Sequence, residues 1–173
     1  IQSMGSGNNK YFTNVGGAIY RGVEGEATYT FDNGFAVFAN GGYNQAFKTH
    51  TNVNLTQAPQ FTSNFGVIYD KNGIYGSVID QWIGGEYSGT GTASGKSPGG
   101  WYDPHNVVNV AAGYTFNHLN PSLSQIKMKL NVDNITDQKQ PIFDNGTDAA
   151  GQTLYFVLPG VSAFVSLSVP INF

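Results

Sequence analysis

The last segment of the chain alternates apolar and polar residues with a period of two. Every second residue is apolar, and serines and an asparagine stand between: Ala163, Val165, Leu167, Val169, Ile171 and Phe173 against Ser166, Ser168 and Asn172. Successive side chains of a β-strand point to opposite faces of a sheet, so this pattern predicts a strand with one apolar face. No 3.6-residue period of useful length occurs elsewhere, and the sequence therefore predicts an all-β fold.

Turn residues divide the rest of the chain. Asp32-Asn33-Gly34 and Lys71-Asn72-Gly73 lie between alternating runs, and Asn-Gly tolerates the positive φ values of a type I′ hairpin turn. A third, looser turn is expected over Asn117–Ser124, around Asn120-Pro121. Polar stretches rich in Gly, Thr, Ser, Asn and Pro are expected to be loops, namely Thr49–Pro59, Ser88–Gly100 and Gln138–Gly151.

Seven full strands are expected between these turns and loops: Tyr11–Phe31, Phe35–Lys48, Gln60–Asp70, Ile74–Tyr87, Trp101–Phe116, Gln125–Asp137 and Thr153–Phe173. A stub at Ile1–Ser3 would be joined to the first of them by a loop over Met4–Lys10. The alternation does not assign the faces of Ile74–Tyr87. Short and long connections alternate along the chain, as they do in antiparallel transmembrane β-barrels with tight periplasmic turns and long extracellular loops.

Composition bears on which face of the sheet is turned to solvent. A soluble barrel or sandwich buries its apolar face, whereas a membrane barrel turns that face to lipid. Charged residues are only 11% of the chain, against about 25% in an ordinary soluble domain, which favours the membrane barrel. The runner-up is a complete small barrel of about eight strands, porin-like or adhesive. A soluble carbohydrate-binding β-sandwich is the third possibility.

Several functions are excluded or disfavoured by composition. The chain has no cysteine, which excludes disulfide scaffolds and cysteine-rich metal sites, and its net charge of −3 provides no basic surface for nucleic acid. No metal-binding spacing links His50, His105 and His118, and no nucleophile is partnered for catalysis, so we expect neither an enzyme nor a cofactor. The chain starts at Ile1 with no visible signal peptide, and we expect a processed chain or a fragment.

Five segments in order resemble the C-terminal part of TonB-dependent outer-membrane receptors. They are Asn14-Val15-Gly16 with Tyr20–Glu26, Asn33-Gly34-Phe35 with Phe38-Ala39-Asn40, Ala58-Pro59 with Phe65–Tyr69, Leu130–Asp137, and Leu158-Pro159-Gly160 before the closing strand. The resemblance covers nearly the whole chain. One departure is Val161, which stands where the family often has an arginine, so the contact of that arginine is in doubt here.

The resemblance implies that the chain, residues 1–173, is about the C-terminal third of a barrel of about 22 strands with a plugged lumen. The plug domain and most of the barrel would lie outside this chain. The family imports scarce nutrients across the bacterial outer membrane, driven by the TonB energising complex through the plug. A ferric siderophore or ferric citrate is the cargo that the resemblance favours.

Candidate functional residues follow from the same reading. Trp101, Tyr102 and His105 follow a long extracellular loop and His50 lies near another, so all four are candidates for ligand contact. For Trp101 and Tyr102, however, the favoured interpretation is the aromatic belt at the membrane interface, and ligand contact is the alternative. A terminal Phe at the end of an alternating strand resembles the signal read by the barrel assembly machinery, which assigns Phe173, Ile171 and Val169 to that signal. Outer-membrane lipid is the remaining expected partner.

Overall fold

A computed structural model of the chain describes residues 2–4, 11–13, 17–89, 94–95, 97, 99–120 and 123–170. Every regular element in this part of the chain is a β-strand. None of these residues belongs to a helix long and apolar enough to cross a bilayer. The prediction of an all-β fold is confirmed.

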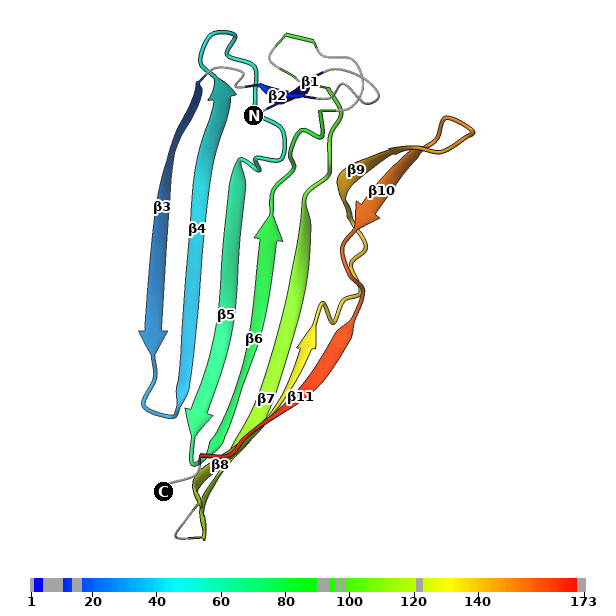
Figure 1. Cartoon of the computed structure of the whole chain (residues 1–173). Helices are drawn as coiled ribbons and strands as arrows, with labels where there is room; N and C mark the ends of the chain where they lie inside the picture. The colour runs from blue at the N-terminus through cyan, green and yellow to red at the C-terminus, as the bar shows by residue number, and fades with distance from the viewer. Residues whose placement is uncertain are drawn as a thin grey trace.

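Seven strands form one antiparallel sheet (Figure 1). In their order across the sheet they are β3 (Ala18–Thr30), β4 (Phe35–Lys48), β5 (Phe61–Lys71), β6 (Ile74–Ile83), β7 (His105–Asn120), β8 (Leu123–Asp133) and β11 (Ser162–Ser168). Two separate hairpins accompany the sheet. One pairs β1 (Gln2–Met4) with β2 (Tyr11–Thr13), and the other pairs β9 (Pro141–Thr147) with β10 (Thr153–Val157).

The number and order of the seven full strands match the prediction, but several boundaries differ. The first predicted strand is divided into β2 and β3, and Met4 belongs to β1 rather than to a loop, whose remaining residues 5–10 lie outside the described part. The strand expected to reach Tyr87 ends at Ile83, before Gly84 and Gly85. The strand expected from Trp101 starts at His105. The loose turn is tighter than predicted, because β7 continues to Asn120 and β8 starts at Leu123.

The predicted loop over Gln138–Gly151 is wrong in part, because it contains β9. The predicted strand Thr153–Phe173 is likewise divided into β10 and β11, separated by residues 158–161. Pro159 lies in this gap, and a proline cannot donate a backbone hydrogen bond to a sheet. Figure 1 shows the β9–β10 hairpin projecting away from the main sheet.

Tight turns gather at one end of the sheet and long connections at the other (Figure 1). Asn72 and Gly73 have φ values of 56° and 82°, so the predicted type I′ turn is confirmed between β5 and β6. The turn between β3 and β4 is different, since only Gly34 has a positive φ, of 96°, and its N–H donates to the carbonyl of Phe31 at 3.3 Å. A type I turn followed by a left-handed glycine accounts for this geometry.

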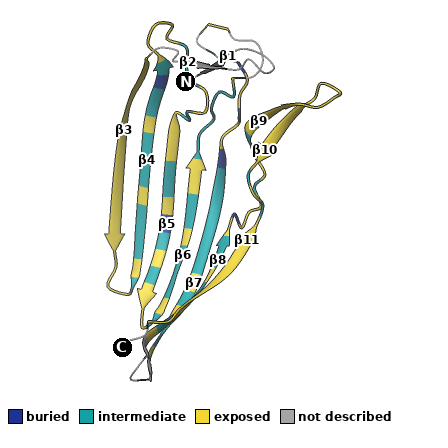
Figure 2. Cartoon of the chain, viewed as in Figure 1, coloured by how far each residue is buried: buried dark blue, intermediate teal, exposed yellow. Residues whose placement is uncertain are grey.

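The sheet is open and forms a single layer. Strands β3 and β11 each have one neighbour, and they do not pair with each other. The small closed barrel is therefore wrong for this chain. Within the described residues only two apolar side chains are buried, Ala46 and Tyr102, and Figure 2 shows most of the sheet as exposed or intermediate. A sandwich needs two packed layers, so that alternative is also wrong.

Strand register separates the sheet into an apolar face and a polar face. One cross-strand row runs through all seven strands and is entirely apolar: Tyr29, Val37, Val67, Val78, Val110, Val132 and Ala163. Because residues paired across strands share a face, the register also assigns the two faces of β6, which the sequence alternation left open. Ile74, Gly76, Val78, Asp80 and Trp82 lie on the apolar face. Asp80 is the polar exception within β6, and Asn106 donates to its carboxylate at 3.0 Å.

Apart from Asp80, the charged residues in the interior of the sheet lie on the polar face. Glu24 and Glu26 lie on it at β3, while Lys127 and Lys129 lie on it at β8. Aromatic rings fill places that glycines leave open on this face: the ring of Phe38 lies over Gly66, and that of Tyr75 lies over Gly113. The Tyr75 hydroxyl donates to the Met128 carbonyl at 3.1 Å, which ties β6 to β8 across β7.

Two bands of aromatic residues cross the apolar face. Near the tight turns the rings contact one another in pairs, Tyr29–Phe31, Phe35–Tyr69 and Tyr114–Phe116. Toward the long connections the second band contains Tyr43, Phe61 and Trp82, all exposed, while the exposed Phe65 lies midway between the two bands on β5. Valine, alanine and glycine occupy most of the space between the bands.

Candidate functional site

A groove lies at the long-connection end, between the β6–β7 connection and the β9–β10 hairpin. Its volume is about 410 Å³, and its lining comprises Ser88, Gly100, Trp101, Tyr102, Asp103, Gln140, Pro141 and Tyr155. Small-molecule sites commonly have volumes of about 300–1,000 Å³ and combine aromatic side chains with a few polar groups. This groove meets both criteria.

Trp101 is held by its surroundings yet leaves much of its ring open to the groove. The indole packs against Gly85, where any side chain would collide with the ring. The ring of Tyr87 meets it edge-on, with centroids 5.0 Å apart. Trp101 nevertheless remains 51% exposed. A fixed aromatic ring with an open side can stack on a ligand without losing rotamer freedom when the ligand binds.

Tyr102 connects the two walls of the groove. Its backbone pairs with Glu86 on one side, and its hydroxyl donates to Asp144 Oδ1 on β9 at 2.5 Å. Burial raises the pKa of the Tyr102 phenol above its usual range, and the hydrogen bond and charge of Asp144 act in the same direction. Burial also raises the pKa of the Glu86 carboxyl. The phenol is therefore a neutral donor at physiological pH and serves to position the hairpin.

The hairpin contributes the opposite wall. Asp144 and Tyr155 are cross-strand partners, so both point to the face of the hairpin that meets Tyr102. Tyr155 is 48% exposed and lines the groove. Gln140, at the base of the hairpin, donates to the Asp103 carbonyl at 3.2 Å. Two side-chain contacts thus join the hairpin to the segment that carries Trp101.

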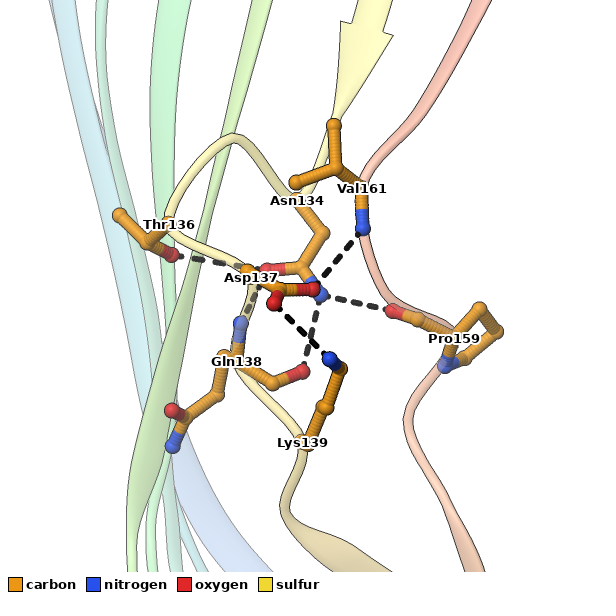
Figure 3. A network of polar contacts seen from close by, with 7 residues as sticks. All are labelled: Asn134, Thr136, Asp137, Gln138, Lys139, Pro159 and Val161. Carbon is orange, nitrogen blue, oxygen red and sulfur yellow. Dashed lines mark hydrogen bonds and ion pairs between the residues drawn. The ribbon is translucent and has the colours of Figure 1, made fainter.

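The base of the hairpin is fixed by Asn134, which is only 5% exposed (Figure 3). Its Nδ2 donates to the carbonyls of Gln138 at 2.9 Å and Pro159 at 2.7 Å, and its Oδ1 accepts from the Gln138 N–H at 2.9 Å. Its own N–H donates to Asn109 Oδ1 at 2.9 Å. Asn134 has a φ of 51°, a region that asparagine adopts more readily than most residues.

Asp137 supports the same turn from its surface (Figure 3). Its carboxylate forms an ion pair with Lys139 at 2.9 Å and accepts from the Val161 N–H at 3.3 Å. The contact with Lys139 contributes most to holding the pKa of Asp137 below its usual range, and the hydrogen bond from the Val161 N–H contributes second. Val161 takes part through its backbone, so this contact does not require an arginine side chain at that position.

The structure brings together only part of the predicted ligand set. Trp101 and Tyr102 line the groove, whereas His105 does not, although it starts β7 nearby and is 9% exposed. His50 is exposed in the β4–β5 connection and is also absent from the lining. In the predicted assembly signal, Val169 is exposed beyond β11, while Ile171 and Phe173 lie outside the described residues.

Three residues important to the groove were missed by sequence reasoning: Glu86, Asn134 and Asp144. Asp144 falls in Phe143-Asp144-Asn145-Gly146, a run whose composition is typical of a turn. Asn134 was noted only as part of a resembling motif. Its positive φ and buried amide could have been suspected because asparagine directly follows an alternating strand.

The side chains that line the groove are of the kinds that bind ligands. The described residues contain no group of three or more His, Cys, Asp or Glu side chains that could hold a metal ion. The groove lining offers aromatic rings, hydroxyls, an amide and the Asp103 carboxylate.

The β-barrel model of the family "TonB dependent receptor-like" matches residues 1–135. The chain belongs to this family of TonB-dependent receptor-like β-barrels. The family resemblance inferred from the sequence motifs is thereby confirmed. No curated protein matches the chain.

Solved structures share the fold of this TonB-dependent receptor-like arc. The ferric citrate transporter FecA in its unliganded form has a TM-score of 0.68 at 16% identity, covering 88% of this chain and 24% of FecA. The copper transporter OprC has a TM-score of 0.64 at 16% identity, covering 87% of this chain and 24% of OprC. The ferric yersiniabactin uptake receptor FyuA from Yersinia pestis has a TM-score of 0.63 at 15% identity, covering 86% of this chain and 23% of FyuA. The chain spans about a quarter of the length of each.

Proposed function

We propose that this chain is the C-terminal β-barrel segment of an outer-membrane receptor that imports a scarce nutrient with energy delivered by TonB. The remaining strands and a plug domain complete that receptor outside this chain. The family match and the open seven-stranded arc support the proposal. The receptor is a transporter and not an enzyme.

The apolar face with its two aromatic bands is the observation that carries the proposal. Phe61 and Tyr69 lie in different bands and are eight residues apart on β5, or about 27 Å at 3.4 Å per residue. With the 35–45° tilt of membrane barrel strands, the bands are about 20 Å apart along the bilayer normal, close to the apolar height of about 25 Å in such barrels. The apolar face therefore contacts lipid, and the polar face lines the lumen.

Single cysteines test this assignment, because this chain has none of its own and any cysteine in the rest of the receptor can be replaced by serine first. Val78 and Val110 lie on the apolar face, and their matched neighbours Ser77 and Ala111 lie on the polar face. Each is changed to cysteine in the whole receptor, coupled to a fluorophore and reconstituted with nitroxide-labelled lipids. We expect strong quenching at Val78→Cys and Val110→Cys and little at Ser77→Cys and Ala111→Cys. Equal quenching on both faces would refute the lipid-facing assignment.

The long-connection end, where the groove lies, faces the exterior in this proposal. The tight turns then lie on the periplasmic side, as in other outer-membrane barrels. Trp101 and Tyr102 contact the cargo from the groove, and His105 and His50 support the same vestibule. A ferric siderophore or ferric citrate is the first candidate cargo, on the likeness to FecA and FyuA.

Uptake and binding measurements on the whole receptor test the cargo. Trp101→Ala should weaken binding of the accepted iron complex about tenfold, because it removes the exposed ring while leaving the Tyr102–Asp144 contact in place. Trp82→Ala, in the second aromatic band on the apolar face, is the matched control and should leave binding unchanged. Uptake should also cease in cells without TonB. Binding of neither ferric citrate nor a ferric siderophore would overturn this choice of cargo, and TonB-independent uptake would overturn the transport mechanism.

Phe173, Ile171 and Val169 form the proposed signal for the barrel assembly machinery. Deletion of Phe173 from the whole receptor should lower its amount in the outer membrane sharply. Val157→Ala, an exposed apolar residue of β10, serves as a control for general loss of hydrophobic surface. An unchanged outer-membrane level after the deletion would refute the assignment.

A further inference from the structure

The groove between the β6–β7 connection and the β9–β10 hairpin combines a carboxylate with aromatic rings. Among the described residues that line it, Asp103 is the only one that carries a charge at neutral pH. Lys139, which precedes the lining residue Gln140, is ion-paired with Asp137 at 2.9 Å and does not line the groove. The charge of the described lining is therefore negative, which disfavours a ligand that presents carboxylates to it.

The Asp103 carboxylate is available to a ligand. The residue is exposed, and its side chain forms no hydrogen bond or ion pair with the described part of the chain. The contact that fixes Asp103 uses its backbone, because its carbonyl accepts from Gln140 Nε2 at 3.2 Å. The carboxylate can thus pair with a cation without first breaking an existing contact.

Two aromatic rings border the same space. Trp101 and Tyr155 line the groove from its two opposite walls, and both are exposed. The face of a tryptophan or tyrosine ring attracts a cation, because the ring quadrupole places negative charge on that face. An ammonium group in this groove can therefore contact a carboxylate and a ring face together, whereas an anionic group would be repelled by both.

Further carboxyl groups stand behind the lining. Glu86 pairs with the Tyr102 backbone on one wall, and Asp144 accepts from the Tyr102 hydroxyl on the other. The second carboxylate oxygen of Asp144 is buried and has no hydrogen-bond partner among the described residues. Acidic groups thus flank the groove on both sides, and their summed field favours a cationic ligand over an anionic one.

We infer that this groove binds an organic ammonium group and that Asp103 is the residue that selects for it. The ammonium nitrogen donates to the Asp103 carboxylate and lies against the ring faces of Trp101 and Tyr155. The inference rests on the proposed function and narrows its cargo to a ferric siderophore that carries an amine. Ferric citrate is disfavoured because it presents carboxylates to an acidic groove.

Two matched probes isolate the charge. One is a linear ferric trihydroxamate with a terminal ammonium group, and the other is the same complex with that nitrogen acetylated, which keeps the iron centre and removes the charge. The whole receptor in detergent should bind the ammonium probe about tenfold more tightly than the acetylated probe, and ferric citrate more weakly than either. The preference should shrink at high salt, because salt screens exposed charges.

Asp103→Asn should lower the affinity for the ammonium probe about tenfold and leave that for the acetylated probe unchanged. Asp133→Asn is the matched control, because Asp133 is exposed on the polar face at the end of β8 and does not line the groove. It removes the same charge and should leave the preference unchanged. Tyr155→Leu is a second variant in case Asp103→Asn impairs folding. It keeps an apolar side chain on β10 but removes the ring, and it should reduce the preference for the ammonium probe.

Three results would overturn the inference. Equal affinity of the wild-type receptor for the ammonium and acetylated probes would remove the role of charge. Tighter binding of ferric citrate than of the ammonium probe would contradict the selectivity and leave iron import intact. An equal loss of affinity in Asp133→Asn would reveal a general charge effect. The proposed function fails separately, if uptake of the bound iron complex continues in cells without TonB.

Discussion

The side-chain amide of Asn134 donates a 2.7 Å hydrogen bond to the carbonyl oxygen of Pro159, 25 residues further along the chain. This bond joins the end of β8 to the segment just before β11, and the whole β9–β10 hairpin lies in the loop that it closes. This buried amide therefore helps to position the groove wall, together with the Tyr102–Asp144 and Gln140–Asp103 contacts.

Asn134→Ala should destabilise this region by about 1–3 kcal/mol, because it removes the buried amide that donates to the Pro159 and Gln138 carbonyls. Urea unfolding of the whole receptor measures the loss, and hydrogen exchange localises it. Asn145→Ala, at an exposed position in the hairpin, is the control and should change stability by less than about 0.5 kcal/mol. Equal effects of the two substitutions would contradict the role of Asn134.

Tyr102→Phe should loosen the β9–β10 hairpin, since the Asp144 carboxylate would lose its hydrogen-bond donor. We expect a cost of about 1–3 kcal/mol and faster proteolytic cleavage at the exposed hairpin tip, residues 148–151. Asp144→Asn retains an acceptor for the Tyr102 hydroxyl and should preserve the attachment better. Cleavage at the wild-type rate in Tyr102→Phe would show that this hydrogen bond does not hold the hairpin.

Gly66→Ala should destabilise the sheet by about 1–3 kcal/mol, because the added methyl group would collide with the ring of Phe38. Gly25→Ala is the natural control, as an added Cβ there meets no atom within 4 Å. The double variant Gly66→Ala/Phe38→Ala should relieve the collision, so its cost should be less than the sum of the single costs. Denaturant unfolding of the wild type, Gly66→Ala, Phe38→Ala, the double variant and Gly25→Ala measures these differences. Simple additivity of the Gly66→Ala and Phe38→Ala costs would argue against the contact between the Phe38 ring and Gly66.

The Asp137 contacts should weaken in acid. The pKa of this carboxyl is lowered in the folded chain by Lys139 and by the Val161 N–H, so its stabilising effect is present above the unfolded pKa of about 3.9 and is lost as the pH falls through the lower folded value. Protection of the Val161 amide against hydrogen exchange, corrected for the intrinsic rate, should therefore fall below about pH 4. The effect is modest because both partners are solvent-exposed. Asp137→Asn should abolish this pH dependence, and a wild-type protection that stays constant would contradict the assignment.

The main sheet could be predicted from sequence because its signals are local. Alternation of apolar and polar residues and the Asn-Gly turns located all seven strands in their correct order. The type of the first turn could not be read in the same way, since Asn33-Gly34 and Asn72-Gly73 look alike but only the second has two positive φ values. Local turn chemistry is compatible with more than one hairpin geometry.

The groove was harder to predict because its parts are distant in the chain and poor in strand signals. The short strand β9 is rich in turn-forming residues such as Asp144, Asn145 and Gly146, so composition indicated a loop. Its pairing with β10 and its contact with Tyr102 belong to the tertiary structure, which local composition does not reveal. The exclusion of His50 and His105 from the groove lining could not be predicted either, because it depends on how the connections pack and not on proximity in sequence.

In the receptor that we propose, the edges of β3 and β11 are the two places where this sheet pairs with strands outside this chain. Each edge presents backbone donors and acceptors in the spacing that another strand would match. Until these pairings form, either edge could also accept a strand from another chain, so intermolecular strand addition competes with closure of the barrel. Correct assembly therefore requires that the edges of β3 and β11 be shielded from other chains until the barrel closes.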